Sequence, residues 1–502
     1  MAWNRRMDGF VVWTTVAVSL LFVANAAGAQ GKPSPVQDEG TISVLLLSDI
    51  HFEPFFDPDK VAQLAAAPAS QWKGILAGPA SADREQRFAA LEQTCHVRGD
   101  DTSYVLLESS LRAMRREAGG AKFATVSGDL ISHAFTCKYE ALFHHAAAGD
   151  YRGFVEKTLD FVMEELRGAL PGVPVYWALG NNDSDCGDYK LDAHSDFLSA
   201  VGGDVTRGFP ESERKDAQAT FAAGGYYNAR LPMRNARLLV LDDLFMVGRY
   251  TTCAGRPDGS AADAQLAWLQ QELIEARQNK EKVWVMGHIP PGVDVHASAT
   301  HPEEICGEKG PRMSLASEKL ADVLVAFSDV VELAIFAHTH MDEVRILMPG
   351  NAAPGITVPG NATQGAAPLK GVAVKMVSSI SPINGNAPSF TVALVEPVSA
   401  ELKDFKVFRA SNQTGVEADW REEYDWGKTY HGAEFSASAV SGVIAGFEAD
   451  PDAKTAASRD YIRTFDVGNN SPLLALVWPQ YVCGLRNDSA QGFKACVCGA
   501  GK

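Results

Sequence analysis

Histidine, aspartate and asparagine residues follow short apolar segments at five places in the chain. The five motifs are Asp49-Ile50-His51, Gly128-Asp129, Gly180-Asn181-Asn182-Asp183, Gly287-His288 and His338-Thr339-His340. Imidazole nitrogen and carboxylate oxygen are ligands that borderline divalent metals accept together. Two such ions roughly 3.5–4 Å apart can activate water and hold the oxygens of a phosphoryl group during in-line displacement. One motif alone is typical of a surface turn, but all five behind apolar segments predict a two-metal site.

Strands that end at one edge of a sheet would bring these motifs together. The segments that we predict as strands are 43–48, 122–127, 173–179, 237–241, 282–286 and 333–337. They are rich in Val, Ile and Leu without polar alternation, which indicates strands buried inside a layered α/β fold. Ligands of open α/β sheets bind beyond the carboxyl ends of the strands. Because side chains two residues apart on an extended chain point to one side, we expect each D-x-H or H-x-H pair to reach one metal site.

The spacing of apolar residues outside these six segments divides the chain into two parts. Apolar spacing near 3.6 residues predicts helices over 103–118, 154–166 and 263–278, and a further strand pair over 390–395 and 405–409. Segment 348–363 is rich in Gly, Pro and Asn and indicates a loop. Helical patterns return at 434–448 and 453–464. We therefore expect an α/β domain over residues 41–400 and a largely helical accessory lobe over residues 401–502.

The N-terminal segment has the pattern of a secretory signal. Arg5 and Arg6 precede an apolar run over 10–23, and Ala27-Gly28-Ala29 forms a small-residue cleavage pattern. An uncleaved membrane anchor is the alternative, although the run is shorter than the ~20 residues that a membrane span needs. We expect a signal peptide over residues 1–29, a leader over 30–40, and a secreted or periplasmic protein after cleavage near Ala29.

Cysteine content and charge limit the classes of function. Eight cysteines behind a secretory signal favour disulfides, but their spacing leaves the pairing open. The net charge of −17 argues against nucleic-acid binding, which needs clustered Lys and Arg. A small phosphorylated substrate remains compatible because a metal pair supplies local positive charge. We expect a monomer, and the composition leaves peripheral contact with a membrane open.

The five motifs, in this order, resemble the calcineurin-like metallophosphoesterase superfamily. The flanks Gly287-His288-Ile289-Pro290-Pro291-Gly292 and His338-Thr339-His340-Met341-Asp342-Glu343, together with segment 378–388, resemble its acid sphingomyelinase-like branch. That branch includes endopolyphosphatases and nucleotide-cleaving phosphodiesterases. The resemblance covers about residues 43–396. It implies a four-layer α/β/β/α metallophosphoesterase sandwich.

The resemblance also implies a set of metal ligands. A first ligand group would consist of Asp49, His51 and His340, and a second ligand group of Asn181, His288 and His338, with Asp129 bridging the two. Zinc is the usual metal of the family, with manganese and iron as alternatives. A hydroxide held between two such ions would attack phosphorus in line with the leaving oxygen.

The proton donor to the leaving group is less well defined by the motifs. Many family members have histidine where this chain has Asn182, and an asparagine amide hydrogen-bonds without releasing a proton. His133, four residues after Asp129, matches another histidine of the sphingomyelinase-like branch. His133 is therefore the candidate general acid. The alternative is that His133 only caps or packs the start of a helix.

Two further groups of residues each have two alternative roles. Asp342 and Glu343 either orient the imidazoles of the H-x-H pair or lie in a solvated turn. The aromatic residues Trp420, Tyr424, Trp426 and Tyr430 either form an apolar rim for a lipid or base, or pack the accessory lobe.

The sequence thus predicts a secreted metal-dependent hydrolase of phosphoric esters, an acid sphingomyelinase-like phosphodiesterase. An endopolyphosphatase and a nucleotide phosphohydrolase are alternatives with the same metal site. A catalytically weak metal- or phosphate-binding protein is the alternative from another class. A phospholipid headgroup, a nucleotide and a polyphosphate all remain candidate substrates, because loop shape and not the metal core selects among them.

Overall fold

The computed structural model describes residues 40–144, 148–299, 301–349, 370–432, 434–468 and 471–499. The expected signal peptide and all but the last residue of the expected leader lie outside the described residues, as does most of the expected loop at 348–363.

The first six-stranded sheet has the order β12-β11-β10-β1-β2-β3. Its strands are β1 (Ile42–Leu47), β2 (Ala124–Ser127), β3 (Val175–Ala178), β10 (Ser389–Val395), β11 (Leu402–Ala410) and β12 (Trp420–Asp425). β1, β2 and β3 run parallel, whereas β10, β11 and β12 continue the sheet by antiparallel pairing. The carboxyl ends of the three parallel strands therefore share one edge, which is where the first three motifs begin.

The second six-stranded sheet has the order β4-β5-β6-β7-β9-β8. Its strands are β4 (Tyr227–Arg230), β5 (Ala236–Val240), β6 (Lys282–Met286), β7 (Val331–Phe336), β8 (Glu343–Leu347) and β9 (Val372–Met376). β5, β6, β7 and β9 are parallel, and β4 and β8 are antiparallel strands at the two edges. This sheet presents the Gly287-His288 and H-x-H motifs after β6 and β7.

The six strands predicted from apolar segments before residue 340 are all observed, as β1, β2, β3, β5, β6 and β7. The pattern succeeds because these strands are buried on both faces: every residue of β2, β3 and β5 is buried. The pair predicted over 390–395 and 405–409 is observed as β10 and β11. Hydrophobic side chains on both faces are what a sheet between two other layers requires.

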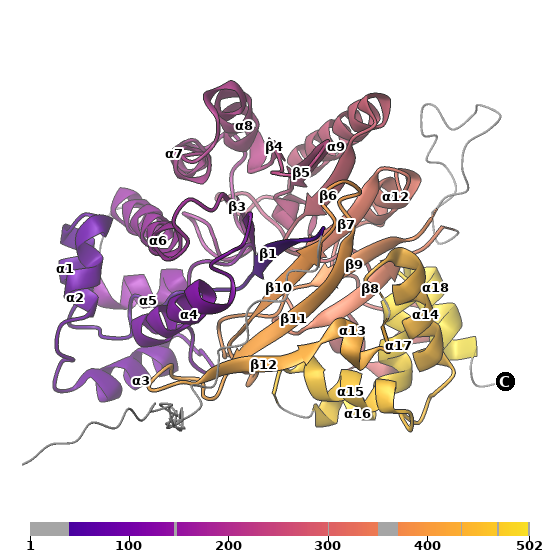
Figure 1. The fold of residues 1–502 in the computed structure, drawn as a ribbon. Helices are drawn as coiled ribbons and strands as arrows, with labels where there is room; N and C mark the ends of the chain where they lie inside the picture. The colour runs from indigo at the N-terminus through magenta and orange to yellow at the C-terminus, as the bar shows by residue number, and fades with distance from the viewer. Residues whose placement is uncertain are drawn as a thin grey trace, which may run out of the picture. The chain divides into compact units, whose positions relative to one another are not determined.

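Helices cover the outer sides of the sheets. They are α1 (Val61–Ala66), α2 (Trp72–Leu76), α3 (Arg84–Thr94), α4 (Tyr104–Glu117), α5 (Phe135–Leu142), α6 (Ala148–Ala169), α7 (Asp196–Val205), α8 (Glu211–Gly224), α9 (Ser260–Asn279), α10 (Val295–Ala299), α11 (Pro302–Ile305), α12 (Lys319–Ala326), α13 (Trp426–Thr429), α14 (Ala437–Glu448), α15 (Ala456–Phe465), α16 (Pro472–Leu476), α17 (Trp478–Arg486) and α18 (Ala490–Gly499), with short 3-10 helices at Ala69–Gln71 and Asp243–Met246. α4 contacts the first sheet, and α9 and α12 contact the second (Figure 1).

The two sheets face each other through aromatic side chains. The rings of Phe123, just before β2, and Trp284, in β6, have centroids 5.6 Å apart. The indole nitrogen of Trp284 donates a hydrogen bond to the carbonyl of Ala400, between β10 and β11, at 2.8 Å. The layers therefore run helices, sheet, sheet, helices, as the family resemblance implied.

The helical C-terminal part begins later than expected. Because β11 and β12 belong to the first sheet, the sheet continues to Asp425, and the division at residue 400 would cut through it. α14 and α17 pack against β8 at the edge of the second sheet. The aromatic residues Trp420, Tyr424, Trp426 and Tyr430 are all buried, so they pack the interior and form no exposed rim.

Neither role expected for Asp342 and Glu343 is observed. Both residues are buried. Asp342 contacts the ammonium of Lys375 and accepts a hydrogen bond from the hydroxyl of Tyr424 at 2.6 Å. Glu343 accepts from the hydroxyl of Tyr481 at 2.7 Å. These carboxylates therefore join the start of β8 to later parts of the chain.

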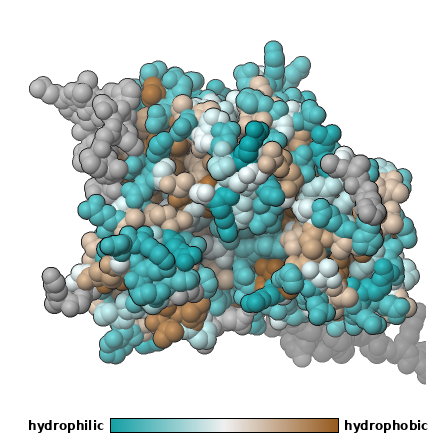
Figure 2. Space-filling view, turned by 180° about the vertical axis from the view of Figure 1, so that it is seen from behind, coloured by the Kyte–Doolittle hydropathy of each residue, from teal (hydrophilic) through white to brown (hydrophobic). Residues whose placement is uncertain are grey.

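Four disulfides are present among the described residues: Cys95–Cys137, Cys186–Cys253, Cys306–Cys498 and Cys483–Cys496. They confirm the expectation of disulfides and are consistent with an extracellular protein. No helix within the described ranges combines the length and apolarity that crossing a bilayer requires. The face shown in Figure 2 is mostly hydrophilic, with its hydrophobic side chains in separate patches.

Candidate metal centre

The structure brings six of the seven predicted ligands into contact at the facing edges of the two sheets. The seventh, Asn181, directly precedes Asn182, which donates two hydrogen bonds to Asp129. In the first ligand group, His51 Nε2 and His340 Nε2 are 3.2 Å apart, and Asp49 Oδ1 lies 3.5 Å from His340 Nε2. In the second, His288 Nε2 and His338 Nδ1 are 3.3 Å apart. Ring nitrogens that face one another at this separation indicate a shared point of coordination.

Asp129 occupies the position between the two ligand groups. Its Oδ2 atom lies 3.4 Å from His51 Nε2 and 3.1 Å from His288 Nε2. One carboxylate oxygen thus reaches an imidazole of each group. This is the placement that a bridging ligand requires.

Several buried oxygens of these residues have no hydrogen-bond partner among the described residues. They are both carboxylate oxygens of Asp49 and the amide oxygen Oδ1 of Asn181. The other amide atom of Asn181, Nδ2, donates to Asp188 Oδ1 at 2.7 Å, which turns the oxygen the other way. Buried oxygen atoms without partners are costly, and a divalent cation would satisfy them. The donor set therefore fits a pair of such cations.

Three of the four histidine rings are hydrogen-bonded through the nitrogen that faces away from the cluster. His51 Nδ1 donates to the carbonyl of Ile131 at 2.9 Å, and His288 Nδ1 donates to that of Ser127 at 2.7 Å. His338 Nε2 lies 3.2 Å from the hydroxyl of Tyr189. Such partners fix the orientation of an imidazole and leave the opposite nitrogen as the ligand atom.

The backbone at the ligands differs from the extended alternation expected for the D-x-H and H-x-H pairs. Asp49, His51, Asp129, His338 and His340 all have positive φ, between 44° and 72°. Residues other than glycine rarely adopt this left-handed conformation, and it is concentrated at functional sites. The pairs converge because each follows the end of its strand in a left-handed turn, and no extended stretch of chain aligns them.

The glycines of the motifs are required by close packing. Gly128 has φ of +94°, and a Cβ on it would lie 2.8 Å from His288 Nδ1. A Cβ on Gly180 would lie 2.1 Å from Asp129 Oδ1. Glycine therefore precedes Asp129 and Asn181 because the loops after β2 and β3 approach each other too closely for a side chain.

Two buried carboxylates that the sequence interpretation left without a role organise the loops. Asp183 accepts hydrogen bonds from the amides of Leu130 at 2.8 Å and Gly180 at 3.0 Å. Asp243, after β5, accepts from the amide of His288 at 2.9 Å. Burial raises the pKa of Asp183 and of Asp243 to about 7. These contacts tie the loops that carry the candidate ligands to one another.

Electrostatics sets the protonation of the cluster. Burial alone would raise the pKa of Asp49, but the neighbouring imidazoles, His340 foremost, hold this pKa at about 2. Burial lowers the pKa of His338 to about 3 and that of His340 to about 4. At neutral pH the carboxylate is charged and these two imidazoles are neutral. Those are the forms that bind a divalent cation.

The other two imidazoles lie among several carboxylates. Burial favours their neutral forms, but the neighbouring carboxylates, Asp129 foremost, together outweigh it and raise the pKa of His51 to about 9 and that of His288 to about 10. Binding of cations at these nitrogens would release protons, as is usual for histidine sites.

His133 lies at the edge of the cluster. Its ring stacks on that of His51 with centroids 4.0 Å apart, and its side chain is 33% exposed. Its Nδ1 lies 3.1 Å from both carboxylate oxygens of Asp101, which also accepts from the hydroxyl of Ser381 at 2.7 Å. Burial opposes the charge on Asp101, but His133 and His51 hold the pKa of that carboxyl well below its usual range. His133 is thus oriented by a charged partner, and the N-cap of α5 is the next residue, Ala134.

Asn182 contacts Asp129, the carboxylate between the two ligand groups. Its backbone amide donates to Asp129 Oδ1 at 2.8 Å, and its side-chain amide donates to Asp129 Oδ2 at 2.9 Å. Asn182 therefore holds the carboxylate that lies between the two ligand groups.

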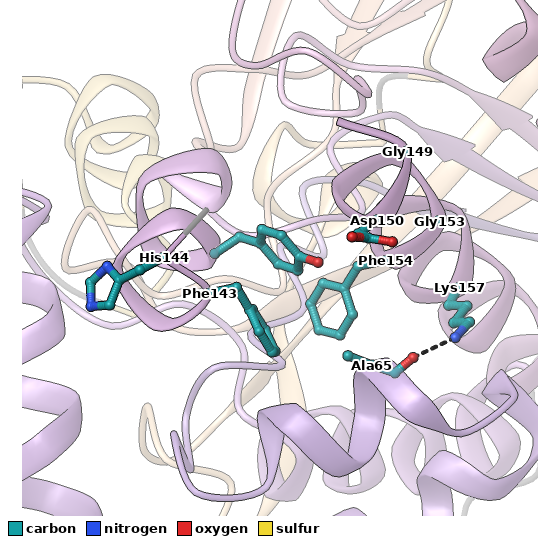
Figure 3. Close-up of a pocket in the computed structure, with 9 residues that line it drawn as sticks. Ala65, Phe143, His144, Gly149, Asp150, Gly153, Phe154 and Lys157 are labelled. Atoms are coloured by element: carbon teal, nitrogen blue, oxygen red, sulfur yellow. Dashed lines mark hydrogen bonds between the residues drawn. The ribbon is translucent and has the colours of Figure 1, made fainter. Parts of the chain in front are cut away.

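A hollow of about 500 Å³ lies elsewhere, among α5, α6 and the end of α1 (Figure 3). Its lining includes Tyr139, Phe143, Phe154 and Lys157, whose ammonium donates to the carbonyl of Ala65 at 2.6 Å. None of its lining residues belongs to the cluster, so this hollow is not the candidate site.

The fold and the cluster define a metal-dependent phosphoesterase, and comparison with known proteins agrees. The calcineurin-like phosphoesterase family matches residues 42–342, and the chain belongs to this family. The chain is 24% identical over 460 residues to acid sphingomyelinase-like phosphodiesterase 3b of Mus musculus, covering 91% of this chain and 90% of that protein. It is 24% identical over 349 residues to cyclic GMP-AMP phosphodiesterase SMPDL3A of Rattus norvegicus, covering 68% of this chain and 70% of that protein.

These relatives confirm the resemblance to the acid sphingomyelinase-like branch. Among solved structures, a dimetal phosphatase from Danio rerio is similar at 14% identity with a TM-score of 0.36, covering 76% of this chain and 98% of that one.

Proposed function

We propose that the chain is a secreted hydrolase of phosphoric esters, acting as a phosphodiesterase with two divalent cations in the cluster. The observation that carries this proposal is the buried cluster of four imidazoles around the carboxylate of Asp129, with the carboxylate oxygens of Asp49, which have no hydrogen-bond partner, beside it. Most buried polar atoms of folded proteins have a partner, and two cations would supply the partners here.

The seven residues divide into the two ligand groups, with Asp129 shared between them. Four of the seven ligands would be histidines, and a nitrogen-rich donor set with carboxylate oxygens favours zinc, with manganese or iron as alternatives. Two such cations would supply Lewis acidity towards a phosphoryl oxygen and an activated water for in-line attack.

The chain's own residues would handle the leaving group. Asp101 holds Nδ1 of His133, which leaves Nε2 as the nitrogen for proton transfer. The stacking of His133 on His51 keeps the ring beside the first ligand group. We assign His133 as the general acid, with Asp101 as its positioning residue. Asn182 would keep the bridging carboxylate in place through its two hydrogen bonds.

The proposed location follows from the N-terminal pattern together with the disulfides. A chain with a signal peptide cleaved near Ala29 would fold in an oxidising compartment, where Cys95–Cys137 and the other three bridges persist. We therefore place the mature protein outside the cell or in a periplasm.

Hydrolysis of bis-p-nitrophenyl phosphate by the purified chain tests the proposal. Chelator treatment should abolish turnover, and zinc or manganese should restore it with a stoichiometry near two. Asp129→Ala should lose both the second ion and the activity, whereas Asp216→Asn, on the exposed face of α8, should match the wild type. Two bound ions without turnover of any phosphoester would favour the binding-protein alternative. Failure to take up any metal would exclude the proposed function.

A further inference from the structure

The two loops that follow β3 and β5 are fastened to each other beside the second ligand group. The β3 loop comprises residues 179–195 and the β5 loop residues 241–259. The amide of Thr251 donates to the carbonyl of Tyr189 at 3.1 Å, within a short bridge between the loops. The disulfide Cys186–Cys253 joins the same two loops covalently. Their alignment therefore depends on a few hydrogen bonds and one covalent bridge.

Asn181, a candidate ligand of the second group, is held by later residues of its own loop. Its carbonyl accepts a hydrogen bond from the amide of Tyr189 at 3.1 Å, and its side-chain Nδ2 donates to Asp188 Oδ1 at 2.7 Å. An asparagine amide carries its donor at one end and its acceptor at the other, so a carboxylate on the nitrogen also decides where the oxygen points. The positions of Asp188 and Tyr189 thus set the orientation of a candidate ligand atom.

Tyr189 also holds a candidate ligand that comes from the other sheet. Its hydroxyl lies 3.2 Å from Nε2 of His338, whose Nδ1 lies 3.3 Å from Nε2 of His288. Tyr189 is buried although it lies in a loop, and its backbone has a φ of +56°. Such a conformation persists only where the surroundings enforce it. One residue of the β3 loop therefore orients two of the three ligands in the second group.

Arg249 of the β5 loop fixes Tyr189 in turn. Its guanidinium carbon lies 3.5 Å from the centroid of the tyrosine ring, and the guanidinium donates to the tyrosine hydroxyl. A guanidinium has donors only, so the hydroxyl oxygen accepts from it and keeps a second lone pair for an N–H at Nε2 of His338. With its proton on Nε2, His338 presents Nδ1 to a cation. This chain of contacts requires the two loops to stay aligned.

Neither loop has regular structure that would keep this alignment by itself. The β3 loop, all of which the structure describes, contains no helix and no strand longer than one residue, and the only helix of the β5 loop is the 3-10 helix Asp243–Met246. Loops of this kind open locally at a low cost in free energy. The half-buried bridge Cys186–Cys253 limits such opening, because it holds one point of each loop at a fixed separation.

The other three disulfides connect elements that carry no candidate ligand. Cys95–Cys137 joins the end of α3 to α5, and Cys483–Cys496 joins α17 to α18. Cys306–Cys498 joins the end of α11 to α18. The bridge between the β3 and β5 loops is therefore the one whose loss should be felt at a single ligand group.

We infer that the disulfide Cys186–Cys253 is a positioning element of the second cation site. It keeps Tyr189 in register with Arg249. Through Tyr189 it orients Asn181 and His338 to bind a cation. The inference rests on the proposed function only in taking the second ligand group as a cation site. The first ligand group has no side chain in either loop, so its affinity for a cation should not depend on the bridge.

Zinc titration of the metal-free chain against a chromophoric chelator tests the inference. In Cys186→Ser/Cys253→Ser, the dissociation constant of one ion should rise at least about 10-fold, as when an outer partner of a ligand is lost, while that of the other ion stays at the wild-type value. Cys306→Ser/Cys498→Ser is the matched control, because it also removes one bridge but should bind both ions as the wild type does. Equal weakening in the two double variants, or no weakening in the first, would overturn the inference.

A second background identifies which ion is affected. His288→Ala removes a ligand of the second group, so this variant should bind one ion, in the first group. Removing the Cys186–Cys253 bridge in this background should leave the affinity for that ion unchanged. A further loss of about 10-fold or more would place the effect in the first group and would contradict the inference.

Arg249→Met tests the same chain of contacts with the bridge intact, and it decides the question if the double variant fails to fold. It should raise the same dissociation constant about 2–10-fold, since one hydrogen bond to the Tyr189 hydroxyl is lost. Arg256→Met, at an exposed arginine of the same loop, is its control and should leave both constants unchanged. Wild-type affinity for both ions in Arg249→Met would count against the inference.

Turnover of bis-p-nitrophenyl phosphate, measured alongside, separates this inference from the proposed function. Two bound ions with the expected selective loss of one, but without turnover of any phosphoester, would support the inference although the proposed function has failed. An active wild type with two ions, together with unchanged constants in the variants, would overturn the inference alone. A wild type that takes up no cation would exclude both.

Discussion

The two flanks of the metal centre use different chemistry. Beside the first ligand group, His133 is hydrogen-bonded to the charged Asp101 and stacked on His51. Beside the second, Arg249 lies on Tyr189, which contacts His338. An imidazole at physiological pH can give up a proton, whereas a guanidinium cannot. One flank is therefore suited to proton transfer and the other to holding a candidate ligand in place.

This difference separates two kinds of effect on substrates. A diester with an alkoxide leaving group needs a proton, and only the His133 flank offers one. A phosphoanhydride needs stabilisation of the departing charge instead. Variants on the His133 flank should therefore sort substrates by their leaving groups, while variants on the Arg249 flank and of the shared ligands should affect all substrates alike.

The largest loss of activity should come from substitution of the candidate ligands. It should be similar for a ligand beside either flank. His51→Ala and His288→Ala each remove one imidazole from a different ligand group. Each should lower activity on every substrate by more than the about 10–100-fold that loss of an outer hydrogen-bonding partner costs. Metal analysis should show about one ion instead of two. A variant that keeps two ions and full activity would remove that histidine from the ligand set.

A smaller and selective effect is expected on the His133 flank. His133→Gln should lower kcat roughly 100-fold for diesters with poor leaving groups, the lower end for general acid catalysis, and much less for p-nitrophenyl esters. Asp101→Asn should act in the same direction but by about 10-fold, as for a partner that orients an imidazole. The measurement is kcat of the wild type and both variants for a series of diesters, plotted against the pKa of the leaving group. Equal losses across leaving groups would assign His133 a structural role.

Tyr189→Phe should have a weaker effect on the opposite flank. The ring under Arg249 remains, but the hydroxyl that joins the guanidinium to His338 is lost. Removing one hydrogen bond of this kind should lower kcat/KM about 2–10-fold for every substrate that is turned over. A loss well above about 10-fold would show that this hydroxyl does more than join the two side chains.

A change in α17, which contributes no candidate ligand, should leave catalysis unaffected. Tyr481→Phe removes the hydroxyl that donates to the buried Glu343 at 2.7 Å. The carboxylate keeps its ion pair with Arg345 but loses a hydrogen bond, which should reduce the free energy of unfolding by about 1–3 kcal/mol. Urea denaturation measures this loss, and kcat/KM per folded molecule should stay at the wild-type value. Altered substrate preference in this variant would mean that the C-terminal helices influence the flanks.

The candidate ligands could be predicted because each follows a buried strand directly. An uninterrupted apolar segment such as 333–337 marks a central strand, and the polar residues after it must lie at its carboxyl edge. The left-handed backbone of Asp49 and His340 could not be predicted this way. It arises from the close approach of loops that are far apart in the sequence.

The flanking residues were missed for a related reason. Asp101 meets His133 across 32 positions, and Ser381 meets Asp101 across 280. Arg249 meets Tyr189 across 60 positions. No local periodicity encodes such contacts. Asp342 and Glu343 were placed in the wrong surroundings because a local pattern does not tell which later helices will cover the start of β8.

The bridge between Cys306 and Cys498 also bears on how the chain is made. The two cysteines are 192 positions apart, and the second lies in the last helix, α18. At synthesis rates of about 5–20 residues per second, Cys306 would wait roughly 10–40 s before Cys498 is made. Throughout that interval its thiol can form a bridge with the wrong cysteine, so a host with strong disulfide isomerase activity should give the higher yield of native protein.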